Sequence, residues 1–199
     1  MNLLTDLIPV ESNFEMVRQE RDFKSAFTGA SQTASSPTSF WEFELIFQNL
    51  RQEQANELIA RLWSLRGTQG RFLLFDWSSP KAMGIGGSYT TVVGANHLPG
   101  QVTIQNVPVG KVVAKPGDYV CVNGELKGLL NEVMGDAFGK AIVRFEPWAR
   151  TRVKGGESVT FDKPTGVFQL EPNYRVPKKS SKKLVLAELV IKGREVMDV

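Results

Sequence analysis

Apolar and polar positions alternate with period two between Phe40 and Gln48. Aromatic and aliphatic residues occupy positions 41, 43, 45 and 47, and Glu42 and Glu44 stand between them. Alternation of this kind, rich in aromatic residues, predicts a strand that buries one face. Before it, the first thirty residues show no long period. The stretch from Ser25 to Ser39 is rich in Ser, Thr, Ala and Gly, which predicts a loop.

The period then lengthens, and apolar residues recur at three- and four-residue spacing. They are Ala55, Leu58, Ile59, Leu62 and Leu65. This spacing places them along one side of a helix of about three turns. We expect Asn49 to cap its first turn, with Gln52 three positions later, and Gly67 to follow its last turn. The segment is predicted to be the only long helix of the chain.

From Arg71 onward, Gly and Pro divide the chain at short and regular intervals. The runs between them predict strands over 71–76, 101–107, 109–114, 119–122, 126–130, 141–145, 158–161, 167–170 and 184–191. Asn123-Gly124 predicts a type I′ hairpin, because both central residues of that turn need positive φ. Many short strands with regular turns indicate a sandwich or a small barrel. The expected fold is therefore mainly β with one main helix.

Composition and charge narrow the class of protein. The 199 residues carry 24 Lys and Arg against 21 Asp and Glu, and 42% are hydrophobic; such a chain can bury a core. No run of 18 apolar residues predicts a membrane span, and the first residues do not follow the pattern of a signal peptide. Positive charge is densest from Lys178 to Lys183. We interpret this run as a solvated loop, with contact to an acidic partner or to nucleic acid as the alternative.

The residues that catalysis requires are scarce. His97 stands in a loop, where we expect a surface residue, and Cys121 in mid-strand is expected to be a packed, inert thiol. One His and one Cys are too few for a zinc site. Gly84 to Ser88 lacks the spacing and the lysine of a phosphate-binding loop, which favours a tight connection. Glu42 and Glu44 share one strand face and are expected to face solvent. We therefore predict no catalytic, cofactor-binding or metal-binding residues and no cofactor.

Aromatic residues crowd between positions 41 and 77. They are Trp41, Phe43, Phe47, Trp63, Phe72, Phe75 and Trp77. The simplest interpretation is one core in which the helix packs over a sheet. Part of this surface could also be a subunit interface, where aromatic residues are enriched.

The order of these elements resembles a known family. The strand Phe40–Phe47, the helix, the stretch Arg66-Gly67-Thr68-Gln69-Gly70-Arg71-Phe72 and the strand end Phe75-Asp76-Trp77 resemble the distal tail proteins of long-tailed (siphovirus-like) phages and related gene transfer agents. A second stretch is similar to a segment of phage minor tail proteins. It comprises Pro116-Gly117-Asp118-Tyr119-Val120, Gly124, Phe145-Glu146-Pro147-Trp148-Ala149-Arg150 and Pro164-Thr165-Gly166-Val167-Phe168-Gln169-Leu170.

The resemblance implies a β-sandwich belt domain, with one main helix, that closes into a hexameric ring at the distal end of the tail tube. We assign the belt to residues 1–82 and 155–199 and a small inserted β-barrel to 85–154. The implied partners are other copies of the chain, the tail tube protein, the hub or tip protein and side fibres, while DNA passes only through the lumen. The implied location is the virion tail, and the host cytoplasm during assembly.

Three other functions remain open at this point. The chain could be another tail component, such as a hub or tube-completion subunit. It could be a glycan-binding tail module, in which Trp77, Tyr89 or Trp148 stacks on a sugar ring. An enzyme is the least favoured reading, because the sequence offers no complete set of catalytic groups.

Overall fold

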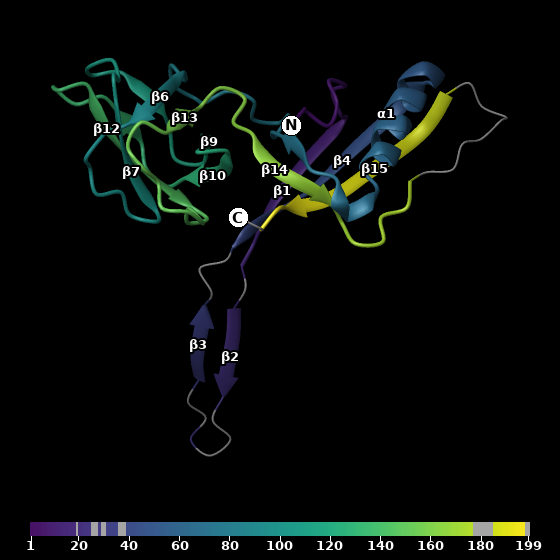
Figure 1. The fold of residues 1–199 in the computed structure, drawn as a ribbon, viewed down its shortest axis with the longest axis horizontal. Helices are drawn as coiled ribbons and strands as arrows, with labels where there is room; N and C mark the ends of the chain where they lie inside the picture. Colours follow the sequence, from purple (N-terminus) through teal and green to yellow (C-terminus); the bar gives the residue numbers. More distant parts are fainter. Residues whose placement is uncertain (19, 25–27, 29–30, 36–38, 177–184, 198–199) are drawn as a thin grey trace.

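The computed structural model describes residues 1–18, 20–24, 28, 31–35, 39–176 and 185–197. This part of the chain is mainly β with a single α-helix, and it contains a small closed barrel, as the sequence predicts. Figure 1 shows three parts: a sheet covered by the helix, the barrel beside it, and a hairpin that projects away from both.

The sheet has five strands in the order β1-β4-β15-β14-β5. Their bounds are Glu11–Val17, Phe40–Arg51, Val185–Glu195, Gly166–Leu170 and Phe72–Leu74. All neighbouring pairs are antiparallel. The alternation that predicts β4 is confirmed, since Trp41, Phe43, Leu45 and Phe47 are buried and Glu42 is exposed.

The helix α1, Gln52–Ser64, follows β4 without a loop. Its predicted apolar side is confirmed, because all five of the residues at three- and four-residue spacing are buried. The predicted capping residue is wrong. Asn49 lies inside β4 with a φ of 54°, and Arg51 is the residue that precedes the first turn. β4 keeps one register with β15 on both sides of Asn49 and continues to Arg51, and Leu50 is buried.

The barrel closes in the order β10-β12-β7-β6-β13-β9. Its strands span Glu125–Leu129, Lys140–Glu146, Gln101–Gln105, Ser88–Thr91, Ser158–Thr160 and Tyr119–Val122, and a small side sheet pairs β8, Val112–Ala114, with β11, Val133–Met134. The turn between β9 and β10 has φ values of 49° at Asn123 and 82° at Gly124, which confirms the predicted hairpin. One boundary needs correction: β13 completes the barrel, so residues 158–160 belong to it and not to the domain of 155–199.

The region before Phe40 departs most from expectation. β1 was not predicted, and β2, Glu20–Lys24, pairs with β3, Ser31–Ser35, to form the projecting hairpin. β3 falls within the stretch that composition predicts to be a loop. Its small polar residues carry no alternation, so its pairing with β2 is visible only in three dimensions.

Two hydrophobic cores support these parts. One lies between the inner face of the sheet and α1, and Leu126 of β10 belongs to it. The other fills the barrel around Phe145 and Phe161. Of the crowded aromatic residues, five are buried in the sheet half of the molecule, whereas Trp63 on α1 is 55% exposed. The single-core interpretation therefore holds for most of them.

Candidate functional site at the sheet–barrel junction

The barrel is inserted between β5 and β14, which are neighbours in the sheet. The two chain connections to neighbouring strands would not by themselves fix the orientation of the barrel relative to the sheet. Side chains at the β9–β10 end of the barrel fix that orientation, because they pack and hydrogen bond against the inner face of the sheet. We call this set of contacts the junction.

Trp41 is the aromatic centre of the junction. Its indole nitrogen donates a hydrogen bond of 3.0 Å to the Leu126 carbonyl in β10. Its ring meets the Tyr119 ring of β9 edge to face, with 5.4 Å between centroids. A residue of the sheet thus joins both strands of the predicted type I′ hairpin.

A buried lysine forms the barrel side of the junction. The Lys127 ammonium lies 2.6 Å from the Glu125 carboxylate and donates to the Trp148 carbonyl at 3.0 Å, and its side chain has no exposed surface. Burial lowers the pKa of Lys127, and the negative charge of Glu125 opposes that shift. The same Glu125 oxygen accepts the backbone N–H of Arg150 at 3.2 Å.

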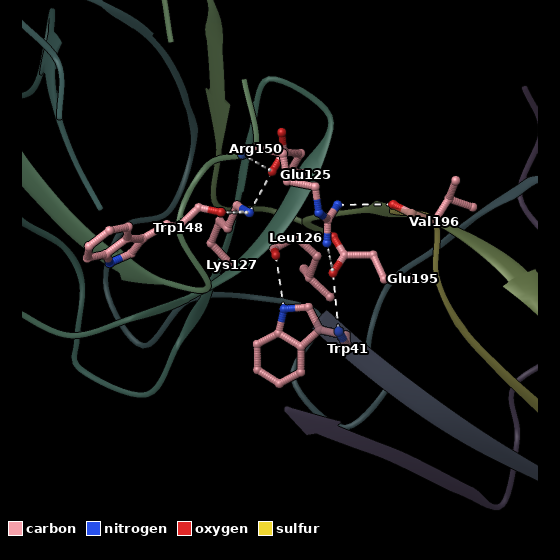
Figure 2. Close-up of polar contacts among 8 residues, drawn as sticks. All are labelled: Trp41, Glu125, Leu126, Lys127, Trp148, Arg150, Glu195 and Val196. Atoms are coloured by element: carbon pink, nitrogen blue, oxygen red, sulfur yellow. Dashed lines mark hydrogen bonds and ion pairs between the residues drawn. The ribbon is translucent and has the colours of Figure 1, made fainter. Parts of the chain in front are cut away.

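Arg150 carries the network from the barrel to the last strand of the sheet, as Figure 2 shows. Its guanidinium lies 2.6 Å from the Glu195 carboxylate and also donates to the Val196 carbonyl at 3.1 Å. Glu195 is 1% exposed and accepts the backbone N–H of Trp41 at 3.2 Å. The buried charge of Glu195 is thus paired across the two bodies, and that of Lys127 within the barrel; pairing is the condition for tolerating buried charges.

A second polar contact joins the sheet to the barrel. Asp76, just after β5, accepts hydrogen bonds from the Ser12 hydroxyl at 2.8 Å and from the backbone N–H of Ser78 at 2.9 Å. It also accepts one from the Tyr119 phenol. Burial, followed by the charge of Asp76 and this hydrogen bond, raises the pKa of Tyr119 to about 12.

The contacts of the junction hold the barrel against the sheet. Glu195 is held by a cation of the barrel, and Asp76 accepts hydrogen bonds from donors of both bodies. Glu125 pairs within the barrel with Lys127, which is shielded from solvent. Sequence reasoning missed these residues. The sequence offered one signal, a charged Lys127 within a short apolar strand. A strand with one polar position is equally typical of a strand with one face exposed to solvent, so the burial of Lys127 could not be predicted.

The residues considered for catalysis have structural partners, and Cys121 stands directly opposite Leu126 in the β9–β10 hairpin. His97 is buried at 7% exposure, which corrects the expectation of a surface residue. Its ring accepts the N–H of Thr103 at 3.3 Å, while the other ring nitrogen lies 3.1 Å from the Val92 carbonyl. Cys121 is half-buried, and burial raises the pKa of its thiol, as expected of an unreactive side chain.

The glycine-rich stretch forms the predicted tight connection, and the two strand glutamates lie on the predicted solvent-facing side of the sheet. Gly86 and Gly87 have φ values of 63° and 103°, and the N–H of Gly87 donates to Asp162 at 3.0 Å, so the stretch is a tight connection. Glu42 is exposed and Glu44 is partly exposed, both on the outer face of the sheet.

The aromatic residues considered for glycan stacking do not converge on one site. Trp77 stacks on Phe75 with 4.4 Å between centroids and packs against the core of the sheet. Tyr89 packs against Phe161 in the barrel core and donates to the Gly86 carbonyl. Trp148 is 47% exposed.

Further features concern the described part of the chain only. Within it, no group of three or more His, Cys, Asp or Glu is arranged to hold a metal ion. No helix in it is both long enough and apolar enough to cross a membrane. The Lys178 to Lys183 run lies outside the described residues.

Comparison with protein-family models and with curated proteins finds no match for this chain.

Proposed function

We propose that this chain is a structural subunit of a phage tail. It forms a ring of six copies at the distal end of the tail tube and connects the tube to the hub and baseplate. The proposal rests on the resemblance of the strand–helix–strand region and on one observation of the fold, the projecting hairpin.

The hairpin of β2 and β3 forms a sheet of its own in the described structure and stands away from both bodies (Figure 1). A two-stranded hairpin is marginally stable in water at best. A partner that covers it is therefore expected, and another copy of the chain supplies one. If the hairpin of each copy contacts the next copy, the repeated heterologous contact closes a ring.

The junction supports the same proposal. A subunit that links two different partners must hold its two bodies at a constant angle under load. Paired buried charges between Arg150 and Glu195, together with the Trp41 contact, hold the barrel to the sheet. In this account one face of the ring meets the tail tube protein and the other meets the hub, and DNA only passes through the lumen.

Removal of the hairpin tests the proposal. We expect the full chain to sediment as six copies of 22.1 kDa, about 133 kDa. A variant with residues 20–35 replaced by a short Gly-Ser turn should keep its circular dichroism spectrum and sediment as a monomer. The control is Phe138→Ser, which removes a large apolar side chain, 86% exposed, from the barrel and should leave the mass unchanged. An unchanged mass after hairpin removal, or a wild-type chain that stays monomeric at every concentration, contradicts the proposal.

Two alternatives predict different outcomes. A hub or tube-completion subunit would assemble with threefold symmetry. A glycan-binding tail module is favoured by one observation: the half-exposed Trp148 ring rests against Gly100, where an added Cβ would lie 3.0 Å from the indole. Binding on a glycan array that Trp148→Ala abolishes would support the glycan function; an array without signal would remove it.

A further inference from the structure

The outer face of the sheet, which is turned away from α1 and the barrel, carries an excess of negative charge. Residues directly opposed on neighbouring strands point to the same side, so the registers of β1, β4 and β15 define its members. We call this set the open face: Glu11, Asn13, Glu15, Glu42, Glu44, Ile46, Gln48, Glu188, Val190, Lys192 and Arg194. Its glutamates outnumber its two cations.

The charge of the open face serves the stability of the sheet only in part. Arg194 of β15 stands opposite Glu42 of β4 on one side. Glu15 of β1 stands opposite Glu42 on the other side, and like charges in that position destabilise a sheet. Glu44 and Lys192 form an ion pair of 2.6 Å, but both side chains are well exposed, and such pairs contribute little. A surface that costs stability is consistent with selection for an intermolecular contact.

The open face is also hollowed beside its glutamates. The charged residues that line a cleft of about 360 Å³ there are four carboxylates and two cations: Glu15, Glu42, Glu44, Glu171, Lys192 and Arg194. A segment with several ammonium groups fits such a surface. The chain has one, since Lys178, Lys179, Lys182 and Lys183 are its densest positive charge.

We propose that the open face binds the Lys178–Lys183 segment of a second copy of this chain. The inference deepens the proposed function, because it names one contact between copies, and it rests on self-association. Charge complementarity selects the occupant, and the self-association in the proposed function supplies the second copy.

A peptide of residues 176–185, labelled with a fluorophore, tests this contact with the intact chain. We expect saturable binding by fluorescence anisotropy at about 50 mM salt, weakened at least about tenfold at 500 mM, because exposed charges are screened. Glu15→Gln with Glu42→Gln should weaken binding about tenfold or more. The matched control, Glu53→Gln with Glu57→Gln, removes the same charge from the exposed side of α1 and should leave binding unchanged.

The outcomes separate this inference from the proposed function. Absence of saturable binding at low salt, or equal weakening by the two pairs of substitutions, overturns the contact. If rings still form in that case, the proposed function stands without it. If the peptide binds as expected but the chain forms no ring, the contact stands and the ring does not.

Discussion

Loss of the Lys127 ammonium is the sharpest test of the junction. In Lys127→Met the apolar stem is kept and the charge is removed. Glu125 then loses the cation 2.6 Å away, and the Trp148 carbonyl loses its donor at 3.0 Å. The variant leaves two acceptors short of partners in a region where the lysine side chain itself has no exposure.

The expected cost is about 2 kcal/mol in the free energy of unfolding. Removing one partner of a buried ion pair costs about 3 to 5 kcal/mol. Two features reduce that cost here. Glu125 is 15% exposed and still accepts the Arg150 N–H, and the variant no longer buries an ammonium. Adding Glu125→Gln should restore more than half of the loss, because both charges are then gone.

The pH dependence gives an independent signature. Burial lowers the pKa of Lys127, so the unfolded chain binds this proton more tightly than the folded chain does. Stability therefore rises with pH through the interval between the lowered pKa and the ordinary lysine value. Lys127→Met should lack this rise.

Urea unfolding, followed by circular dichroism and tryptophan fluorescence, measures these changes. The matched control is Lys192→Met, which breaks an ion pair of the same 2.6 Å length on the exposed face of the sheet and should have no measurable effect. The reasoning fails if Lys127→Met is as stable as the wild type, or if the double variant is no more stable than the single one.

Three further predictions concern the same fold. Trp41→Phe removes the donor to the buried Leu126 carbonyl and should lower the free energy of unfolding by about 1 to 3 kcal/mol; an unchanged urea midpoint would contradict it. Gly193→Ala places a Cβ against a backbone carbonyl and 2.6 Å from a phenylalanine ring, so the melting transition should drop sharply or vanish. The pKa values of Tyr119 and Tyr174 are raised to about 12, chiefly by burial. The unfolded chain loses these protons near pH 10, so stability should fall as pH rises from 10 to 12, and less steeply in the Tyr→Phe variants.

The strongest periodicities were the parts of the fold that could be predicted from the sequence. β4 and α1 show clear periods of two and three to four residues, and the turn at Asn123-Gly124 follows from its need for positive φ. The residue at which the helix begins could not be predicted from the sequence. β4 runs directly into α1, and no local pattern distinguishes Asn49, which lies inside the strand, from a helix cap.

Long-range contacts explain what the sequence did not reveal. β13 is a three-residue strand, and whether it joins the barrel or the sheet depends on pairing with β6 and β9. The buried position of His97 depends on two backbone groups from the surrounding strands and loop. The junction is less predictable still, because Lys127 and Glu195 are far apart in the sequence and their burial exists only once the barrel meets the sheet.

Electron microscopy of the purified full-length chain tests the central claim most directly. The account predicts closed particles with sixfold symmetry, a central opening and a mass of six chains. Particles with threefold symmetry, or a chain that remains single while it binds and converts a small molecule, would contradict it.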